Sequence, residues 1–387
     1  MNLRISQVNK ARGDFNARQG MPRCCMLNRP GNKKTLRHCG WIVGISYCAP
    51  GSGGITYDHL NRLLEEMCSH GMNYLSLMMQ SYAYYDPEHD GYAWPVANPR
   101  LSGYVDEKNI NARKETEFVS KILKDAERFK IDVELTLNWG IWNNDRISMS
   151  YPDACLQQDR SGKPLDSLHC PDSPGAWQLG LDEVADLLSF YGNHPALKRF
   201  AFERISYAGR GGCYCKHTRE VFAGRAPKPL DKVPETELVR WKEENIGRKI
   251  TEYTSSIKAW FPRIKIGCST VGNPHWGHNP ARFREWGIDY IQPHTIQHKA
   301  RKRHLYSTWA RLTPNPMILH FDLRDRAPQN YPIWQKTPKI IKKVMSWVKD
   351  APVSNLDGIL FFNEPVVSEP NRQAMYAALA SSFTIGG

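Results

Sequence analysis

The sequence lacks any long hydrophobic run. No apolar stretch in its 387 residues approaches the roughly 18 to 20 residues that are needed to cross a bilayer. Hydrophobic residues still make up 41% of the chain, which is enough for a large buried core. We therefore expect a soluble, globular protein with no membrane partner.

Glycine-rich phosphate loops are missing as well. No turn of the dinucleotide-binding or P-loop type follows any of the expected strands. Phosphate groups are commonly bound by such loops together with Lys or Arg at a helix N-terminus. We therefore expect no nucleotide and no other cofactor.

Cysteines are few for this length, ten in all, and they follow no disulfide framework. Cys68 falls in an expected helix and Cys268 in an expected strand, so we expect both to be buried thiols. Four ligand-type residues stand close together near the start of the chain: Cys24, Cys25, His38 and Cys39. Their spacing matches no common zinc pattern, so the sequence predicts no metal site.

Positive charge is concentrated at the start of the chain. Residues 1–40 hold nine Lys or Arg against one acid, Asp14, and so contribute +8 of the net charge of +13. This segment is polar and without period, which favours a disordered or surface-laid extension ahead of a catalytic domain at 41–387. It has no apolar segment typical of a secretory signal. The sequence as given therefore fits a cytoplasmic location, and a later true start, for example at Met21, would leave export open.

Expected strands and helices alternate along the rest of the chain. The strands are expected at 41–48, 72–80, 131–139, 197–203, 263–270, 288–294, 316–322 and 356–363. The helices are expected at 57–70, 114–130, 176–191, 218–223, 235–260, 280–286, 299–312, 338–349 and 369–383. Eight strands in this alternation indicate an α/β fold of the (β/α)8 TIM-barrel type, a single domain with long βα loops. A doubly wound open sheet is the alternative.

In such a barrel the active site lies at the carboxyl ends of the strands. The residues there and on the adjoining loops are rich in amides, imidazoles and aromatic rings. Those that we expect to bind substrate are Tyr47, Gln80, Tyr84, Asn138, Trp139, Trp142, Tyr207, Trp276, Gln292, His294, His320 and Asn363. Sugars have apolar C–H faces that stack on aromatic rings and hydroxyls that need polar partners. Carbohydrate is therefore the expected ligand, with packing of the rings under loops as the alternative.

Cleavage of a glycosidic bond needs two carboxyl groups at one anomeric carbon. We expect Glu203, at the end of the fourth strand, to be the general acid/base, because Phe202 and Tyr207 could desolvate it and raise its pKa. Its partner is expected to be Glu364, with Asp322 close behind. The structural alternatives are a salt bridge for Glu203 and a hydrogen-bond anchor for each of the other two acids.

Several motifs carry a family resemblance. HCPDSPGAW, LKRFAFERISY and CYCKHTREVF, between His169 and Phe222, resemble bacterial glycosyl-hydrolase-like (β/α)8 barrels grouped with polysaccharide-degrading proteins, as does LDGILFFNEP near the C-terminus. The matching residues are Cys170, Pro171, Glu203, Cys213, Cys215 and Phe222. In two places the chain departs from the family, which commonly has aspartate at Glu203 and a third cysteine at Thr218. Only two thiols then remain at close spacing, which weakens the case for a metal-binding cysteine loop.

The resemblance implies a glycoside hydrolase of poly- or oligosaccharides. A broader likeness is to retaining glycosidases with an acid/base glutamate after the fourth strand and a nucleophilic glutamate after the seventh. Retention is therefore expected, although the seventh strand ends here in Asp322. Two other functions stay open. One is a carbohydrate-binding barrel without catalysis, and the other is nucleic-acid association through the basic tail with Lys299, Arg301, Lys302 and Arg303.

Overall fold

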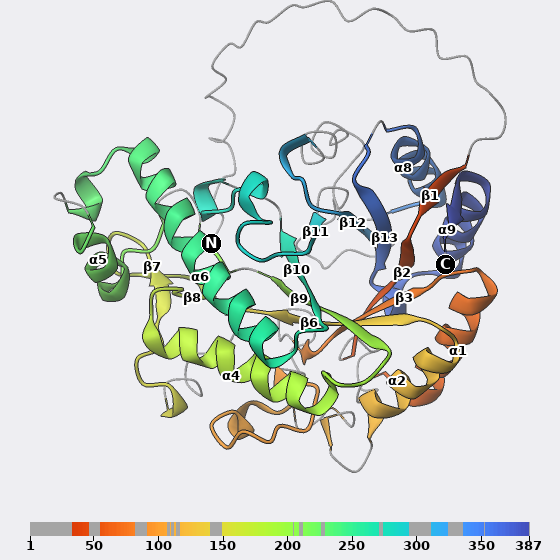
Figure 1. Ribbon diagram of the computed structural model, residues 1–387, viewed down its shortest axis with the longest axis horizontal. Helices are drawn as coiled ribbons and strands as arrows, with labels where there is room; N and C mark the ends of the chain where they lie inside the picture. Colours follow the sequence, from red (N-terminus) through yellow and green to blue (C-terminus); the bar gives the residue numbers. More distant parts are fainter. Residues whose placement is uncertain are drawn as a thin grey trace, which may run out of the picture. The chain divides into compact units, whose positions relative to one another are not determined.

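A closed barrel of eight parallel strands forms the centre of the computed structural model (Figure 1). The structure describes residues 33–45, 55–81, 91–106, 109, 112–113, 117–139, 149–203, 205–208, 212–225, 229–270, 274–293, 311–323, 336–351 and 353–386. In chain order the barrel strands are β2 (His38–Gly44), β3 (Tyr74–Met78), β6 (Asp132–Asn138), β9 (Leu197–Glu203), β10 (Lys265–Thr270), β11 (Tyr290–Pro293), β12 (Met317–Asp322) and β13 (Leu356–Phe362). Each pairs in parallel with the next, and β13 closes on β2. The predicted (β/α)8 barrel is confirmed.

Helices run on the outside of the barrel between successive strands (Figure 1). Those described are α1 (Tyr57–Ser69), α2 (Phe118–Arg128), α4 (Pro174–Tyr191), α5 (Lys216–Ala223), α6 (Glu235–Trp260), α8 (Pro338–Asp350) and α9 (Glu369–Ser382). Local sequence sets several of their starts. The Thr56 hydroxyl accepts from the His59 N–H at the start of α1, and the Ser173 hydroxyl accepts from the Ala176 N–H at the start of α4. The expected helix at 299–312 lies almost wholly outside the described residues.

Two hydrophobic clusters hold the barrel together. The larger one packs the outer faces of the strands against the helices. The smaller one fills the inside, and its members are Ile42, Tyr74, Met78, Tyr290, Ile318, Leu360 and Phe362. Gly267 makes room for the Tyr290 ring, because a Cβ at this position would lie 2.3 Å from the ring. The interior cluster identifies which residues of β2, β3, β11, β12 and β13 point inward.

Short strands that the sequence did not predict complete the fold. β4 (Gln80–Ser81) pairs with β5 (Gly91–Tyr92), and β7 (Leu156–Gln158) pairs with β8 (Pro164–His169). β1 (Lys34–Leu36) pairs in parallel with β14 (Phe383–Ile385). β1 and the start of β2 belong to the body, so our boundary at residue 40 was placed too late. Residues 1–32 lie outside the described part, and the expectation of a disordered extension there stays a prediction.

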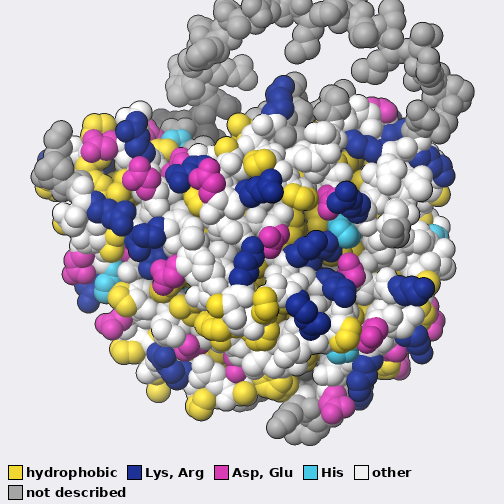
Figure 2. All heavy atoms as spheres, viewed as in Figure 1, with side chains coloured by type: hydrophobic (Ala, Val, Ile, Leu, Met, Phe, Trp, Pro, Cys, Tyr) yellow, Lys and Arg dark blue, Asp and Glu magenta, His cyan; other side chains and the backbone are white. Residues whose placement is uncertain are grey.

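The surface carries charges of both signs. On the face shown in Figure 2, Lys and Arg side chains are interspersed with Asp and Glu. Within the described residues, no helix combines the length and apolar character needed to cross a membrane. The four basic residues at 299–303 that we considered for nucleic-acid binding lie outside the described part of the chain.

Candidate active site at the carboxyl end of the barrel

A buried acid, Glu134 on β6, organises the lower half of the barrel interior. Its carboxylate accepts hydrogen bonds from the Tyr74 hydroxyl at 2.8 Å, the Ser76 hydroxyl at 2.6 Å and the Tyr290 hydroxyl. The Gln292 amide donates to both of its oxygens, at 2.9 and 3.0 Å. A buried charge needs this number of donors to offset its lost hydration. Glu134 is thereby committed to holding the barrel together.

Arg199 on β9 lies below this network. Its guanidinium lies over the rings of Tyr74, at 4.8 Å, and Tyr290, at 5.5 Å. It also lies 2.7 Å from the imidazole of His38, at the start of β2. These contacts fill the amino-terminal end of the barrel with packed side chains. The interior position left for chemistry is therefore the carboxyl-terminal end.

Glu203 is the last residue of β9 and points into the carboxyl-terminal end of the barrel interior, which we call the upper layer. It follows Arg199 and Ala201 on the inward face, because side chains alternate along a strand. Its register neighbours are Asn138 on β6 and Ser269 on β10. The Ser269 hydroxyl donates to one carboxylate oxygen at 2.9 Å, and Glu203 is 9% exposed. The strand and the serine together fix the direction of the carboxyl group.

Asp322 has the matching position on β12, the seventh strand of the barrel. It shares the inward face with Ile318 and His320 and is fully buried. Its register neighbour on β13 is Phe362, whose ring lies 5.1 Å from the ring of His320. The fourth and seventh strands thus each end in an acid that faces the same interior.

Glu364, which we favoured as the second catalytic acid, lies elsewhere. It stands in the short helix η9 (Glu364–Val366), and Arg372 of α9 donates to its carboxylate at 2.5 Å, while His59 of α1 lies at 2.8 Å. Burial alone would raise the pKa of Glu364, but the His59 hydrogen bond and the Arg372 charge together lower it. Arg372 also lies over Trp41, on the outer face of β2. We therefore correct this assignment: Glu364 is an ion-pair anchor between the first and last helices.

Two aromatic residues expected at the mouth belong to the core. Trp139 is 2% exposed and packs against Trp177 of α4, with ring centroids 6.1 Å apart. Tyr207 is fully buried, and its hydroxyl donates to Asp172 at 2.7 Å. Both turn outward toward the helical layer. Their assignment as sugar-binding residues was wrong.

The expected cause of a raised Glu203 pKa is also wrong. Phe202 lies on the opposite face of β9 and packs against Tyr253 of α6, with ring centroids 5.4 Å apart. Tyr207 is bonded to Asp172, as described above. Neither ring desolvates Glu203. The Ser269 hydroxyl donates to this carboxyl group, and Asn138 is the register neighbour of Glu203 on β6.

Three of the expected substrate amides instead bond to the barrel itself. Gln80 accepts from the main-chain N–H of Asn138 at 2.6 Å. Gln292 donates to Glu134, and Asn363 accepts from the N–H of Gly44 at 3.1 Å. These side chains are engaged in hydrogen bonds within the barrel wall, so we no longer assign them to substrate contact.

The remaining expected residues divide into two groups. Asn138 and His320 face the upper layer, and Trp276 is half-buried in the helix η5 (Pro274–Trp276) beyond β10. Four others lie outside the described residues: Tyr47, Tyr84, Trp142 and His294. The sequence reasoning missed Met78 and Phe362, apolar residues at the same level as the acids. Alternation with Tyr74 and Leu360 was the signal that could have found them.

Buried polar residues hold the loop that leaves Glu203. Gln157 of β7 donates to the Ser206 carbonyl at 2.8 Å and accepts from the Ala208 N–H at 2.6 Å. His278 contacts the Ile205 carbonyl at 3.0 Å and the Thr270 hydroxyl at 2.7 Å. Burial lowers the pKa of His278 to about 4, so its imidazole is neutral at pH 7. Residues 205–208, which follow β9, are therefore held in place by hydrogen bonds.

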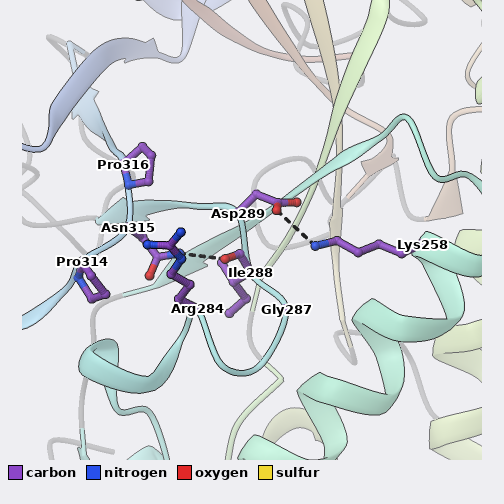
Figure 3. Close-up of a pocket in the computed structure, with 8 residues that line it drawn as sticks. All are labelled: Lys258, Arg284, Gly287, Ile288, Asp289, Pro314, Asn315 and Pro316. Carbon is purple, nitrogen blue, oxygen red and sulfur yellow. Dashed lines mark hydrogen bonds and ion pairs between the residues drawn. The ribbon is translucent and has the colours of Figure 1, made fainter.

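A pocket of about 520 Å³ lies at the opposite end of the strands (Figure 3). It is lined by residues just before β11 and β12, among them Asp289 and Asn315. The Lys258 ammonium is paired with Asp289 at 3.1 Å, and the Asn315 amide donates to the Ile288 carbonyl at 2.7 Å. These polar groups of the pocket thus bond to one another, and the pocket lies at the other end of the strands from Glu203 and Asp322. We assign it no role in catalysis.

Outside the barrel interior, one group of described residues could hold a metal ion between its side chains. It consists of Cys155, Cys170 and Cys215, beside the β7–β8 hairpin.

No protein-family model matches the chain, and no curated protein matches it in sequence. Among solved structures it is similar to the glycoside hydrolase domain of PgaB (BpsB) from Bordetella bronchiseptica, with a TM-score of 0.64 and 10% identity over 89% of this chain and 98% of that domain. It is also similar to β-galactosidases from Bacillus circulans sp. alkalophilus, with a TM-score of 0.61 and 13% identity, and from the haloarchaeon Halorubrum lacusprofundi, with 0.60 and 10%. The chain covers 55% and 57% of those two proteins, and they cover 89% and 88% of it. At these identities the likeness shows the barrel fold.

Proposed function

We propose that the protein is a glycoside hydrolase that acts on a poly- or oligosaccharide. The observation that carries the proposal is the pair of acids, Glu203 and Asp322, that end the fourth and seventh barrel strands on the inner face. Two carboxyl groups that face one anomeric carbon are the minimum for glycosidic cleavage. The barrels that resemble this chain include a glycoside hydrolase domain and β-galactosidases, which supports the same chemistry here.

Glu203 acts as the general acid/base in this proposal. The Ser269 hydroxyl donates to one of its oxygens and orients the carboxyl group, which protonates the glycosidic oxygen as the bond breaks. Asp322 attacks the anomeric carbon and forms a glycosyl ester. Water, deprotonated by Glu203, then releases the sugar with its original configuration. Retention rests on the position of the two acids along the chain, which resembles that of retaining barrels.

The upper layer offers both kinds of surface that a sugar ring needs. Met78 and Phe362 are apolar and 8% and 5% exposed. Asn138 and His320 supply an amide and an imidazole at the same level. C–H faces can pack on the first pair, and hydroxyls can bond to the second. Carbohydrate fits this mixture better than a phosphate ester does.

The test is hydrolysis of a glycan panel by the full chain and by Glu203→Gln. Reducing-sugar release is measured across neutral, amino and acidic poly- and oligosaccharides. On any substrate that the wild type cleaves, we expect the variant to lose about 10²- to 10⁴-fold in kcat, the contribution typical of a general acid/base. Proton NMR of the first anomer released tests retention separately.

A matched control separates catalysis from folding. Gln retains the shape of Glu and can still accept from Ser269, so circular dichroism and Tm should stay near those of the wild type. Full turnover by Glu203→Gln would remove the proposal. Glycan binding without turnover by the wild type would select the carbohydrate-binding alternative.

A further inference from the structure

Four cysteines from two separate parts of the chain meet beside the β7–β8 hairpin. Cys155 and Cys170 flank the hairpin, while Cys213 and Cys215 directly precede α5. The sulfurs of Cys155, Cys170 and Cys215 lie within 4.8 Å of one another, and those of Cys170 and Cys215 are 3.4 Å apart. All are buried except Cys155, which is half-buried. The described chain has no comparable group of thiols.

The separations of these three sulfurs match three corners of a tetrahedral zinc site. Cys213 is outside this group of three, but its side chain is hydrogen-bonded to those of Cys170 and Cys215, which places it beside the fourth corner. A Zn–S distance of about 2.3 Å in a tetrahedron places neighbouring sulfurs about 3.8 Å apart. The observed values of 3.4 Å and at most 4.8 Å lie on either side of this figure. A disulfide needs sulfurs about 2.05 Å apart, so the 3.4 Å separation is that of two unbonded sulfurs.

The surroundings of the sulfurs fit thiolate ligands. The main-chain N–H groups of Gln158 and Cys215 each lie 3.4 Å from the sulfur of Cys213. The Thr218 hydroxyl lies 3.2 Å from the sulfur of Cys170 and 3.6 Å from that of Cys215. Donors around the ligands stabilise the anionic sulfurs and orient them toward a metal. Four neutral thiols, by contrast, are weak donors and gain little from such neighbours.

We propose that Cys155, Cys170, Cys213 and Cys215 bind one structural zinc ion. Each thiol gives up its proton on binding, and four sulfurs complete the tetrahedron without water, which makes the site structural rather than catalytic. Soft thiolates favour zinc over magnesium or calcium. The ion joins the β7–β8 hairpin to the segment before α5 and so reinforces the loop that continues from Glu203. Our sequence interpretation counted only Cys213 and Cys215 and missed the two ligands from the hairpin.

The experiment measures metal in the full chain purified from zinc-supplemented medium. Elemental analysis after dialysis should give about one zinc per chain, and Cys155→Ser and Cys213→Ser should lose most of it. Cys268→Ala, at a buried thiol in β10, is the matched control and should retain the ion. Exchange of zinc for cobalt should produce the sulfur-to-cobalt charge-transfer absorption of a tetrahedral thiolate site.

A second measurement on the wild type protects the test against unfolded variants. Removal of zinc by a strong chelator should lower Tm and make four further thiols reactive, and added zinc should reverse both changes. Wild-type protein that carries no zinc and develops no cobalt absorption would overturn the proposal. An intact mass showing a disulfide between Cys170 and Cys215 would overturn it as well.

Discussion

Glu203 and Glu364 show how surroundings give two glutamates different roles. Glu203 faces the barrel interior and accepts a hydrogen bond from the Ser269 hydroxyl. Glu364 is paired with Arg372 and His59, and its pKa is lowered. A general acid must hold a proton near neutral pH, which a cationic partner opposes. The acid/base role therefore does not suit Glu364, and we propose it for Glu203.

His278 gives a prediction on pH at the same scale. Its pKa is lowered to about 4 by burial, against 6.5 for the unfolded chain. As the pH falls, the unfolded state binds this proton before the folded state does. The contribution of the neutral His278 to the free energy of unfolding is therefore complete above pH 6.5 and is lost as the pH falls toward 4. The expected loss is about 3 kcal/mol for this group. Urea unfolding between pH 4 and 7 should show a shallower slope for His278→Asn than for the wild type.

The exposed His70, directly after α1, provides the control. His70→Asn should keep the wild-type slope, because this side chain is exposed to solvent. Equal slopes for His278→Asn and the wild type would contradict the assignment of a buried neutral imidazole.

At the scale of elements, the β7–β8 hairpin positions the loop after β9. Gln157 of this hairpin makes three hydrogen bonds. Its amide donates to the His169 and Ser206 carbonyls and accepts from the Ala208 N–H. Gln157→Leu removes all three at similar volume and leaves buried main-chain groups unpaired. We expect a loss of at least about 1–3 kcal/mol and faster hydrogen exchange at residues 205–208.

Gln158→Leu is the control for this variant. Gln158 contacts Cys213 and Tyr214 through its main chain, which the substitution retains. Unchanged exchange at residues 205–208 in Gln157→Leu would show that the hairpin does not hold the loop.

For the whole molecule, the barrel includes more of the N-terminal region than its composition suggests. β1 pairs with β14, and the Lys34 ammonium donates to the Ala351 carbonyl at 2.9 Å. Deletion of residues 1–32 retains these contacts, so we expect wild-type Tm and activity. Deletion of residues 1–40 removes β1 and the start of β2, and we expect an insoluble or unfolded chain. Equal Tm for both deletions would contradict the assignment of β1 and β2 to the fold.

The sequence could predict the barrel because alternation and capping are local. The eight strands and the helices expected at 57–70, 338–349 and 369–383 fall close to their expected ranges. The site was only partly predictable, because burial depends on what packs against a residue from far along the chain. Trp139 faces Trp177, and Glu364 faces Arg372 and a histidine some 300 positions away. The cysteine cluster likewise joins two segments of the chain, 155–170 and 213–215, that are apart in the sequence.

The most direct test compares kcat/KM for Asp322→Asn and Glu364→Gln on a glycan that the wild type cleaves. Both variants replace a buried carboxylate by its amide, but only Asp322 faces the barrel interior with Glu203. We expect Asp322→Asn to lose at least about 10²-fold and Glu364→Gln, assayed well below its reduced Tm, to stay close to the wild type. Full turnover by Asp322→Asn together with loss in Glu364→Gln would contradict the assignment of the catalytic pair.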